Sequence, residues 1–125
     1  MQSQLEHLNI TVPEPEATAD MLRTLFGWQI RWQGPAKDGG HSVHVGGDDS
    51  YVALYAPKAP LQRAESSYGR VNGLNHLGVV VADLDAVEAR VKGLGMVPHS
   101  HGDYAPGRRF YFHDANGLEI EVVQY

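Results

Sequence analysis

An internal repeat constrains the fold of this chain more than any other feature of its sequence. Residues 5–12 read LEHLNITV and residues 74–81 read LNHLGVVV, so His7 and His76 occupy equivalent positions at an offset of 69 residues. A repeat of this length predicts that one supersecondary unit occurs twice. We therefore expect a single domain over residues 1–125, built from two similar modules.

Each copy continues from its first strand into a helix with one apolar stripe. Pro15 suits the first turn of one helix, and Asp83 suits the N-cap of the other. Gly27 and Gly95 are expected to end the helices. The side chains predicted to face the core are Ala17, Met21, Leu22 and Leu25 in the first helix and Leu84, Val87, Val91 and Leu94 in the second.

The last strands of the two copies also align, now at an offset of 68 residues. The segment HSVHVGGDDSYVALYA corresponds to RRFYFHDANGLEIEVVQY, which sets the turn at residues 47–49 against the turn at residues 115–117. Ala53 then corresponds to Glu121. The alignment predicts that each copy ends in a pair of antiparallel strands.

The predicted order is therefore one strand, one helix and three strands, repeated. This pattern indicates an α+β fold of two βαβββ modules, with module one at about residues 2–56 and module two at about residues 73–125. The intervening residues 57–72 carry prolines and serines without hydrophobic periodicity, which predicts a linker.

Composition narrows the classes of function. Ten Lys and Arg against fifteen Asp and Glu give a net charge of −5, so we expect no nucleic-acid partner. The longest apolar stretch, residues 77–84, is far shorter than the ~20 residues that cross a bilayer, so we expect no membrane span. The N-terminal residues lack the pattern of a signal peptide, and there is no cysteine. The expected compartment is the cytoplasm, and any metal ion would be held by imidazole and carboxylate groups.

Strand alternation places the candidate metal ligands on one side of each sheet. In LEHLNITV the apolar residues face the helix and His7 faces the other way; His76 and Glu121 do the same in the second copy. On an open sheet such a face would simply meet water. If the two sheets curl toward each other, this face lines a cup, and the three side chains converge there.

These segments resemble the vicinal-oxygen-chelate superfamily, which includes glyoxalase I, bleomycin-resistance proteins, fosfomycin-resistance enzymes and extradiol dioxygenases. The likeness rests on EHLNITV, NHLGVVVADLDA and FYFHDANGLEIEVVQY. It implies a curved mixed-sheet half-barrel, a divalent metal ion (Fe²⁺, Mn²⁺ or Zn²⁺) held by His7, His76 and Glu121, a small-molecule substrate that chelates through oxygen, and a homodimer. Ala115 stands where the family usually has proline in the turn.

The resemblance also bears on the reaction. Ala53 occupies the position where glyoxalase I normally has a Glu or Gln that handles substrate protons, which disfavours the glyoxalase-like lyase or isomerase reading. Fosfomycin enzymes typically carry a cationic residue beyond the ligand glutamate, and none follows Glu121 here. Extradiol dioxygenases have a tyrosine ten residues before that glutamate, as Tyr111 is, and a histidine near the position of His101. We therefore expect dioxygenase-like chemistry.

Tyr111 and His101 are thus the candidate catalytic residues; Tyr111 would orient or deprotonate a bound hydroxyl group. The loop expected at HSHGDYAPG, which contains His101, would close over the cup. Arg108 and Arg109 are expected to be ordinary surface cations. One rival hypothesis from another class remains, a metal-free drug-binding protein similar to bleomycin-resistance proteins.

Overall fold

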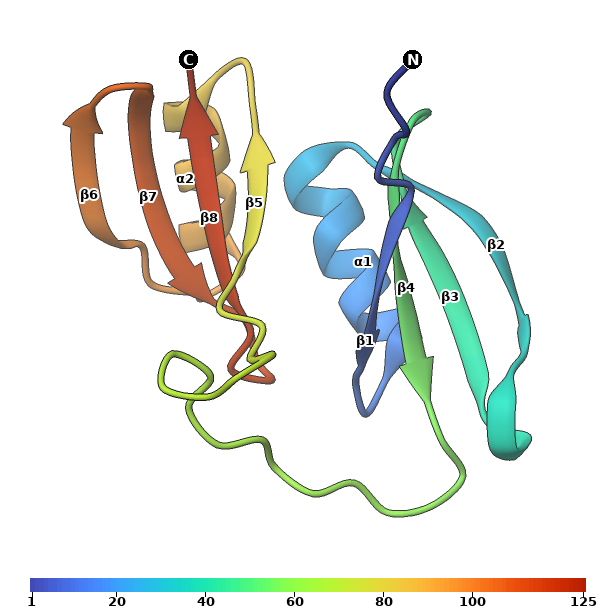
Figure 1. Ribbon diagram of the computed structural model, residues 1–125. Helices are drawn as coiled ribbons and strands as arrows, with labels where there is room; N and C mark the ends of the chain where they lie inside the picture. Colours follow the sequence, from blue (N-terminus) through green and yellow to red (C-terminus); the bar gives the residue numbers. More distant parts are fainter. The chain divides into compact units, whose positions relative to one another are not determined.

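The computed structural model describes residues 1–125, which divide into two compact units, residues 1–62 and 63–125. The first contains β1 (His7–Thr11), α1 (Pro15–Phe26), β2 (Gln29–Pro35), the short 3₁₀ helix η1 (Lys37–Gly39), β3 (His41–Gly46) and β4 (Tyr51–Ala56). The second contains β5 (Leu77–Val80), α2 (Leu84–Gly93), β6 (His99–Tyr104), β7 (Gly107–His113) and β8 (Glu119–Gln124). The predicted α+β fold of two βαβββ modules is confirmed (Figure 1).

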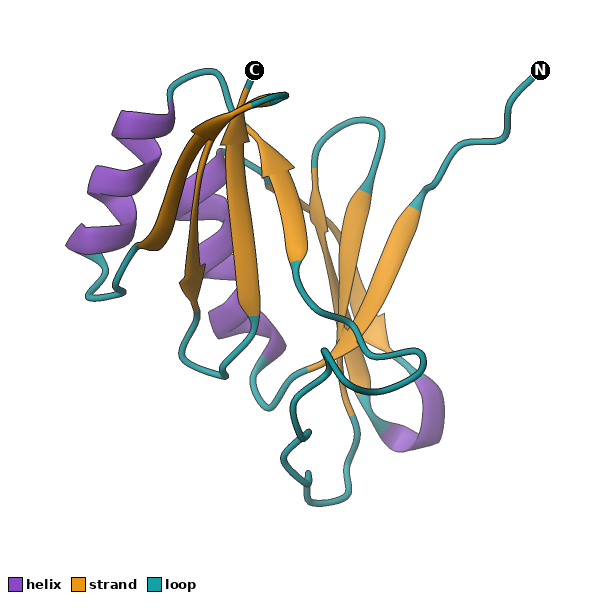
Figure 2. Ribbon diagram, turned by 60° about the vertical axis from the view of Figure 1, so that its left-hand side comes forward, coloured by secondary structure: helices purple, strands orange, loops and turns teal.

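Each unit has one four-stranded mixed sheet with the same topology. The strand orders are β1-β4-β3-β2 and β5-β8-β7-β6. The first strand of each unit pairs in parallel with the last, and the other neighbours are antiparallel. A parallel pair needs a long crossover, and the helix forms part of it. Figure 2 shows a helix against one face of each sheet, which leaves the opposite face without a helix from its own unit.

The helix α1 begins and ends as the sequence predicts, but its buried stripe is displaced. A proline lies in its first turn, and Gly27 caps its C-terminus in the left-handed conformation, at φ 70°. Leu22 and Leu25 are buried as expected, whereas Ala17 is exposed and Met21 is only partly buried. The stripe includes Pro15, Thr18 and Ala19 in their place. These positions also recur at three- and four-residue steps, so the predicted burial of Ala17 and Met21 is wrong.

The helix α2 confirms the predicted N-cap. The side chain of Asp83 accepts a hydrogen bond of 3.0 Å from the backbone N–H of Ala86. Leu84, Val87 and Val91 are buried as predicted. Leu94 is 48% exposed because the helix ends at Gly93, one residue before it, so its assignment to the stripe was wrong.

The core of each unit lies between its sheet and its helix. In the second unit Phe110, Phe112, Ile120 and Val122 alternate along β7 and β8 and are completely buried. In the first unit the fully buried side chains are Val43, Val45 and Leu54 of the sheet and Leu22 and Leu25 of α1. Full burial of each such side chain contributes about 1.5–3 kcal/mol, so this face of the sheet stabilises each unit.

Of two segments predicted to lack regular structure, one contains no helix or strand and the other contains a strand. No helix or strand occurs between Ala56 and Leu77, the range that contains residues 57–72. The segment HSHGDYAPG, predicted as a glycine and proline loop, instead forms strand β6 and the turn that follows it. Neither α1 nor α2 is both long enough and apolar enough to cross a membrane.

Candidate functional site

Glu121 lies at the centre of a polar cluster on the helix-free face of the second sheet. Its neighbours Ile120 and Val122 are fully buried beneath the helix, so alternation turns Glu121 to the other side. In the sheet register Glu121 is paired with Gly78 on β5 and with Tyr111 on β7. Its side chain is 14% exposed. A carboxylate buried to this extent needs partners.

Three side chains supply these partners. Tyr111 donates a hydrogen bond of 2.7 Å, and Arg109 one of 3.0 Å, to the same oxygen, Glu121 Oε2. The other oxygen, Oε1, lies 3.3 Å from Nε2 of His76. Burial alone would raise the pKa of Glu121, but the hydrogen bonds from Tyr111 and Arg109 and the charge of His76 outweigh it and lower the pKa. Glu121 is therefore a carboxylate at neutral pH.

Tyr111 acts on this carboxylate as a donor. Its hydrogen bond to Glu121, together with burial, raises the pKa of Tyr111 to about 12. The phenol therefore keeps its proton at neutral pH, and in this arrangement it is suited to orient an oxygen rather than to deprotonate one.

His76 is held from its other side by the linker. The Tyr68 hydroxyl lies 3.3 Å from His76 Nδ1 and donates a hydrogen bond of 2.6 Å to Glu119 Oε2. The hydrogen bond to Glu119 raises the pKa of Tyr68. Both nitrogens of the imidazole thus have polar neighbours, with Tyr68 at Nδ1 and Glu121 at Nε2.

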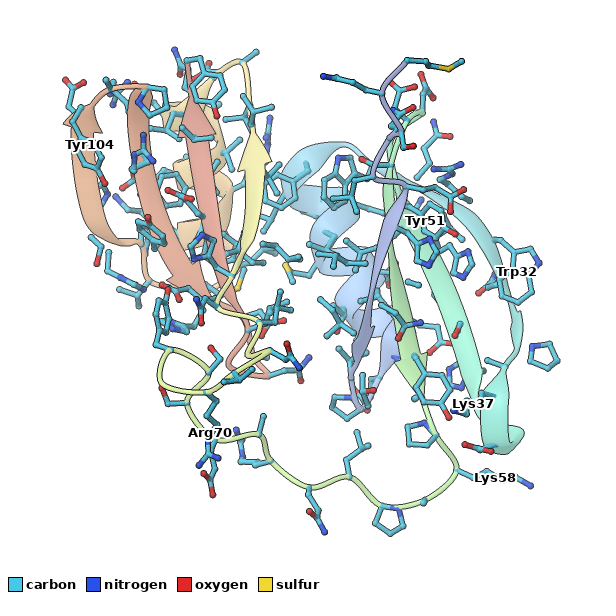
Figure 3. The ribbon with its side chains drawn as sticks, viewed as in Figure 1. Trp32, Lys37, Tyr51, Lys58, Arg70 and Tyr104 are labelled. Carbon is cyan, nitrogen blue, oxygen red and sulfur yellow. The ribbon has the colours of Figure 1, made fainter.

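Arg109 was expected to be a surface cation, and this expectation is wrong. Its side chain is only 11% exposed, and its guanidinium carbon lies 4.5 Å from the centre of the Tyr104 ring. Besides Glu121 it binds the carbonyl of Gly107, while its buried Nε has no partner. The Tyr104 ring folds over Gly102, where a Cβ atom would approach it to 2.5 Å. Figure 3 shows Tyr104 at the β6 edge of its sheet. Arg108, by contrast, pairs with Asp85 of α2 as an exposed ion pair.

The histidines of β6 separate onto opposite faces. His99 Nε2 lies 3.2 Å from His113 Nδ1, and the His99 ring stacks on Tyr111 at 6.3 Å on the Glu121 side. His101 lies 3.0 Å from Glu88 of α2 and stacks on the core residue Phe110. The proposed catalytic residue His101 therefore faces the helix and is not brought together with Glu121.

The equivalent face of the first unit carries a row of rings. His7 stacks on Tyr51 at 4.9 Å, Tyr51 on His44 at 4.6 Å, and His44 contacts Trp32 at 4.9 Å. Figure 3 shows Trp32 and Tyr51 in this unit. His7 Nδ1 also lies 2.8 Å from Glu6 Oε1. Burial, aided by the charge of His7, lowers the pKa of His44.

Of the predicted site residues, the structure thus brings together His76, Glu121 and Tyr111, while His7 lies in the first unit and is described there alone. No group of three or more His, Asp or Glu side chains within either unit is arranged to hold a metal ion. The donor chemistry does fit one, because imidazole and carboxylate suit Fe²⁺, Mn²⁺ and Zn²⁺. Since Oε2 accepts two hydrogen bonds, Oε1 of Glu121 is the oxygen left to bind a cation beside His76 Nε2.

The family is identified by comparison. A family model described as the Glyoxalase/Bleomycin resistance protein/Dioxygenase superfamily matches residues 4–122. The chain belongs to this superfamily. The match covers the strands that carry His7, His76 and Glu121 and the linker between the units, so the resemblance noted in the sequence is confirmed. No curated protein matches the chain.

Solved structures agree on the superfamily fold. A glyoxylase/bleomycin resistance protein/dioxygenase domain from Frankia sp. EAN1pec matches with a TM-score of 0.80 at 16% identity, covering 99% of this chain and 98% of that one. The fosfomycin resistance protein FosX from Listeria monocytogenes, complexed with Mn(II) and sulfate, matches with 0.73 at 19% identity, covering 100% and 94%. FosX from Mesorhizobium loti matches with 0.71 at 21% identity, covering 98% and 92%. At these identities the likeness supports the fold alone.

Proposed function

We propose that this chain is a divalent-metal-dependent enzyme that acts on a small organic substrate bound through adjacent oxygens. In this proposal His7, His76 and Glu121 hold the metal ion. The observation that carries it is the pairing of His76 Nε2 with Glu121 Oε1 at 3.3 Å, in a cluster that keeps Glu121 ionised. Membership in a superfamily that contains metal-dependent enzymes supports the same conclusion.

The protein residues have separate roles in this site. Tyr111 and Arg109 hold Glu121 as a carboxylate and fix its orientation, leaving Oε1 available. Tyr111, which stays protonated, can also donate to a substrate oxygen without removing its proton. When bound, Fe²⁺, Mn²⁺ or Zn²⁺ would act as a Lewis acid toward the chelating oxygens of the substrate.

Within this class we propose dioxygenase-like ring cleavage over glyoxalase-like isomerisation. Ala53 lies on β4 at the position that corresponds to Glu121 on β8, because both are the third residue of their strands. A methyl group can neither bind metal nor transfer a proton, so the first unit has no counterpart of Glu121 at this position.

The test is a screen of O₂ uptake. The protein is reconstituted with Fe²⁺ without oxygen and then exposed to O₂ with a panel of catechols. We expect uptake with at least one catechol, lost in Glu121→Ala and retained in Glu119→Gln, which alters the neighbouring carboxylate on the same face. Uptake equal in the wild type and Glu121→Ala, or no uptake with any catechol, would count against the dioxygenase assignment.

A second candidate is a fosfomycin-modifying enzyme, favoured by the nearly buried cation Arg109 beside Glu121. An arginine there is suited to bind a phosphonate once it is released from the carboxylate. Fosfomycin resistance proteins are among the similar structures, one of them complexed with Mn(II). Mn²⁺-dependent consumption of fosfomycin, with water or a thiol as the nucleophile, would favour this candidate, and Arg109→Met should abolish it.

The proposal also includes a homodimer, as the resemblance implies. Light scattering of the purified chain tests this directly. A single species of twice the chain mass is expected, and a monomer at all protein concentrations would refute it.

A further inference from the structure

The two repeat-equivalent histidines have the same ring nitrogen engaged, although by different side chains. In the first unit, His7 Nδ1 lies 2.8 Å from the carboxylate of Glu6, to which Tyr51 also donates a hydrogen bond of 3.4 Å. In the second unit a carboxylate, a phenol and an imidazole occur again, but the phenol of Tyr68 stands between the other two groups. Each unit therefore combines its histidine with one carboxylate and one tyrosine.

The direction of the hydrogen bonds around Tyr68 follows from elementary chemistry. A phenol has one proton, and an ionised carboxylate can only accept. Tyr68 therefore uses its one proton in the 2.6 Å hydrogen bond that it donates to Glu119. The phenol oxygen can then only accept from His76, so at 3.3 Å it favours the imidazole proton on Nδ1. The Glu121 carboxylate, which also only accepts, lies 3.3 Å from Nε2 and favours the proton there. Tyr68 therefore shifts the neutral imidazole toward the form whose lone pair is on Nε2, the nitrogen that a metal ion would bind.

The linker holds Tyr68 in place for this contact. Ser67 Oγ donates to Asn75 Oδ1 at 3.0 Å, one residue before His76. The backbone N–H of Arg70 bonds to the carbonyl of Ser67, and that of Gly73 bonds to the carbonyl of Arg70. A Cβ atom on Gly73 would lie 2.3 Å from the Ser67 carbonyl oxygen, so the close approach of these two residues requires glycine. The segment therefore closes on itself around Tyr68.

We propose that Tyr68, oriented by Glu119, is a positioning residue that favours the proton of His76 on Nδ1 and so presents Nε2 for metal ligation. A partner at the second imidazole nitrogen commonly fixes the tautomer and ring orientation of metal-binding histidines. Here that partner comes from the linker rather than from a strand. This inference rests on the proposed metal-dependent function, with Glu6 performing the same task for His7.

The substitutions Tyr68→Phe, Glu119→Ala and Glu119→Gln separate this role from a general effect on folding. Tyr68→Phe leaves Nδ1 without its acceptor. Glu119→Ala frees the phenol proton, so Tyr68 can donate to Nδ1 and move the imidazole proton to Nε2. Glu119→Gln keeps a carbonyl oxygen that accepts from Tyr68, and it should behave as the wild type. Tyr55→Phe is the matched control, because the Tyr55 hydroxyl bonds only to the carbonyl of Lys37.

The first measurement is the ¹⁵N spectrum of the His76 ring in the metal-free protein, at a pH where the ring is neutral. We expect the fraction of rings with a protonated Nδ1 to be equal in the wild type, Glu119→Gln and Tyr55→Phe. It should be smaller in Tyr68→Phe and smallest in Glu119→Ala, where the proton moves to Nε2 beside Glu121. A fraction unchanged by Tyr68→Phe, or larger in Glu119→Ala than in the wild type, would overturn the inference.

The second measurement is the dissociation constant of Zn²⁺, a diamagnetic probe, by competition with a chromophoric chelator. Tyr68→Phe should weaken binding about 10- to 100-fold, with Glu119→Gln and Tyr55→Phe within about twofold of the wild type. If the wild type binds Zn²⁺ and Tyr68→Phe binds it equally well, the positioning role fails. If the wild type binds no Zn²⁺, the metal proposal fails, and the ring spectrum alone decides whether Tyr68 sets the tautomer.

Discussion

Tyr111 lies directly opposite Glu121 in the pairing of β7 with β8, and its phenol donates a 2.7 Å hydrogen bond to the Glu121 carboxylate. Directly opposed residues on one face are the closest side-chain neighbours in an antiparallel pair. The contact is thus a product of strand register, and it joins the candidate metal ligand to the candidate substrate-orienting group.

The first prediction concerns this hydrogen bond. Tyr111→Phe should lower the free energy of unfolding by about 1–2 kcal/mol at pH 7, because a bond to a partly buried charged acceptor is lost. Urea unfolding measures the change. Tyr55→Phe, which loses only a bond to a backbone carbonyl at an exposed site, should cost less. Equal losses in the two variants would show that the Glu121 charge does not strengthen the Tyr111 contact.

The second prediction concerns His101, whose side chain lies on the helix side of the sheet, against Glu88. His101→Ala should leave the dissociation constant for Zn²⁺ within about twofold of the wild type, since the change lies on the opposite face from Glu121. His76→Ala should abolish binding in the same titration. Loss of metal in His101→Ala, without unfolding, would return His101 to the candidate site.

The third prediction is a pH dependence that arises at Glu88. Burial raises the pKa of Glu88, but hydrogen bonds from His101 and Lys92 outweigh it, so the pKa is lowered overall. A carboxyl group of lowered pKa contributes stability above its unfolded-state pKa of about 4.3 and loses that contribution as the pH falls through the lower folded-state value. Glu88→Gln should therefore cost about 0.5–1 kcal/mol at pH 6 and almost nothing at pH 3. Urea unfolding at the two pH values checks this, and an equal cost at both would contradict it.

The fourth prediction uses the difference between the two helix starts. Asp83 caps α2 through its side chain, whereas Glu14, the N-cap of α1, makes no capping hydrogen bond from its side chain. Asp83→Ala should destabilise the protein by about 1 kcal/mol, and Glu14→Ala should change it by less than about 0.5 kcal/mol. Thermal unfolding compares them. A larger loss in Glu14→Ala would mean that the caps have been assigned wrongly.

Strand alternation accounts for the part of the site that was predictable. The repeat placed His76 and Glu121 on the same face, and the same alternation extends that face to Tyr111 and Arg109. Arg109 lies two residues before Tyr111, so alternation alone predicts the face it occupies, although arginines on a sheet surface are usually exposed. Its burial depends on Tyr104, which closes over it from β6.

The position of His101 was not predictable from alternation. His99 pairs with Tyr111, but Gly102 pairs with Arg109, so β6 contains one extra residue between these pairs. Ser100 adopts a left-handed backbone conformation there, at φ 55°. Such a bulge turns the residues beyond it to the opposite face. His99 and His101, two residues apart, therefore face opposite sides, and a serine gives no indication of this in the sequence.

The position of the Tyr68 side chain could not be predicted from the sequence, for a different reason. Its segment has no hydrophobic periodicity, so neither helix nor strand rules place its side chain. Its contact with His76 depends on hydrogen bonds local to the linker, such as that from Ser67 to Asn75. The helix boundaries, in contrast, followed closely from Asp83 and Gly27, because capping is a property of a few adjacent residues.

We propose that His7, His76 and Glu121 together hold one divalent metal ion. The most direct test is the metal content of the chain after incubation with Zn²⁺ and removal of free metal, for the wild type and the three alanine variants. His41→Ala is the control, because His41 is exposed to a similar degree as His7 but pairs with Glu16 of α1. We expect about one ion per chain in the wild type and the control, and less than about 0.2 in each of the three variants. A wild type without metal, or a His7→Ala variant that keeps its full content, would contradict it.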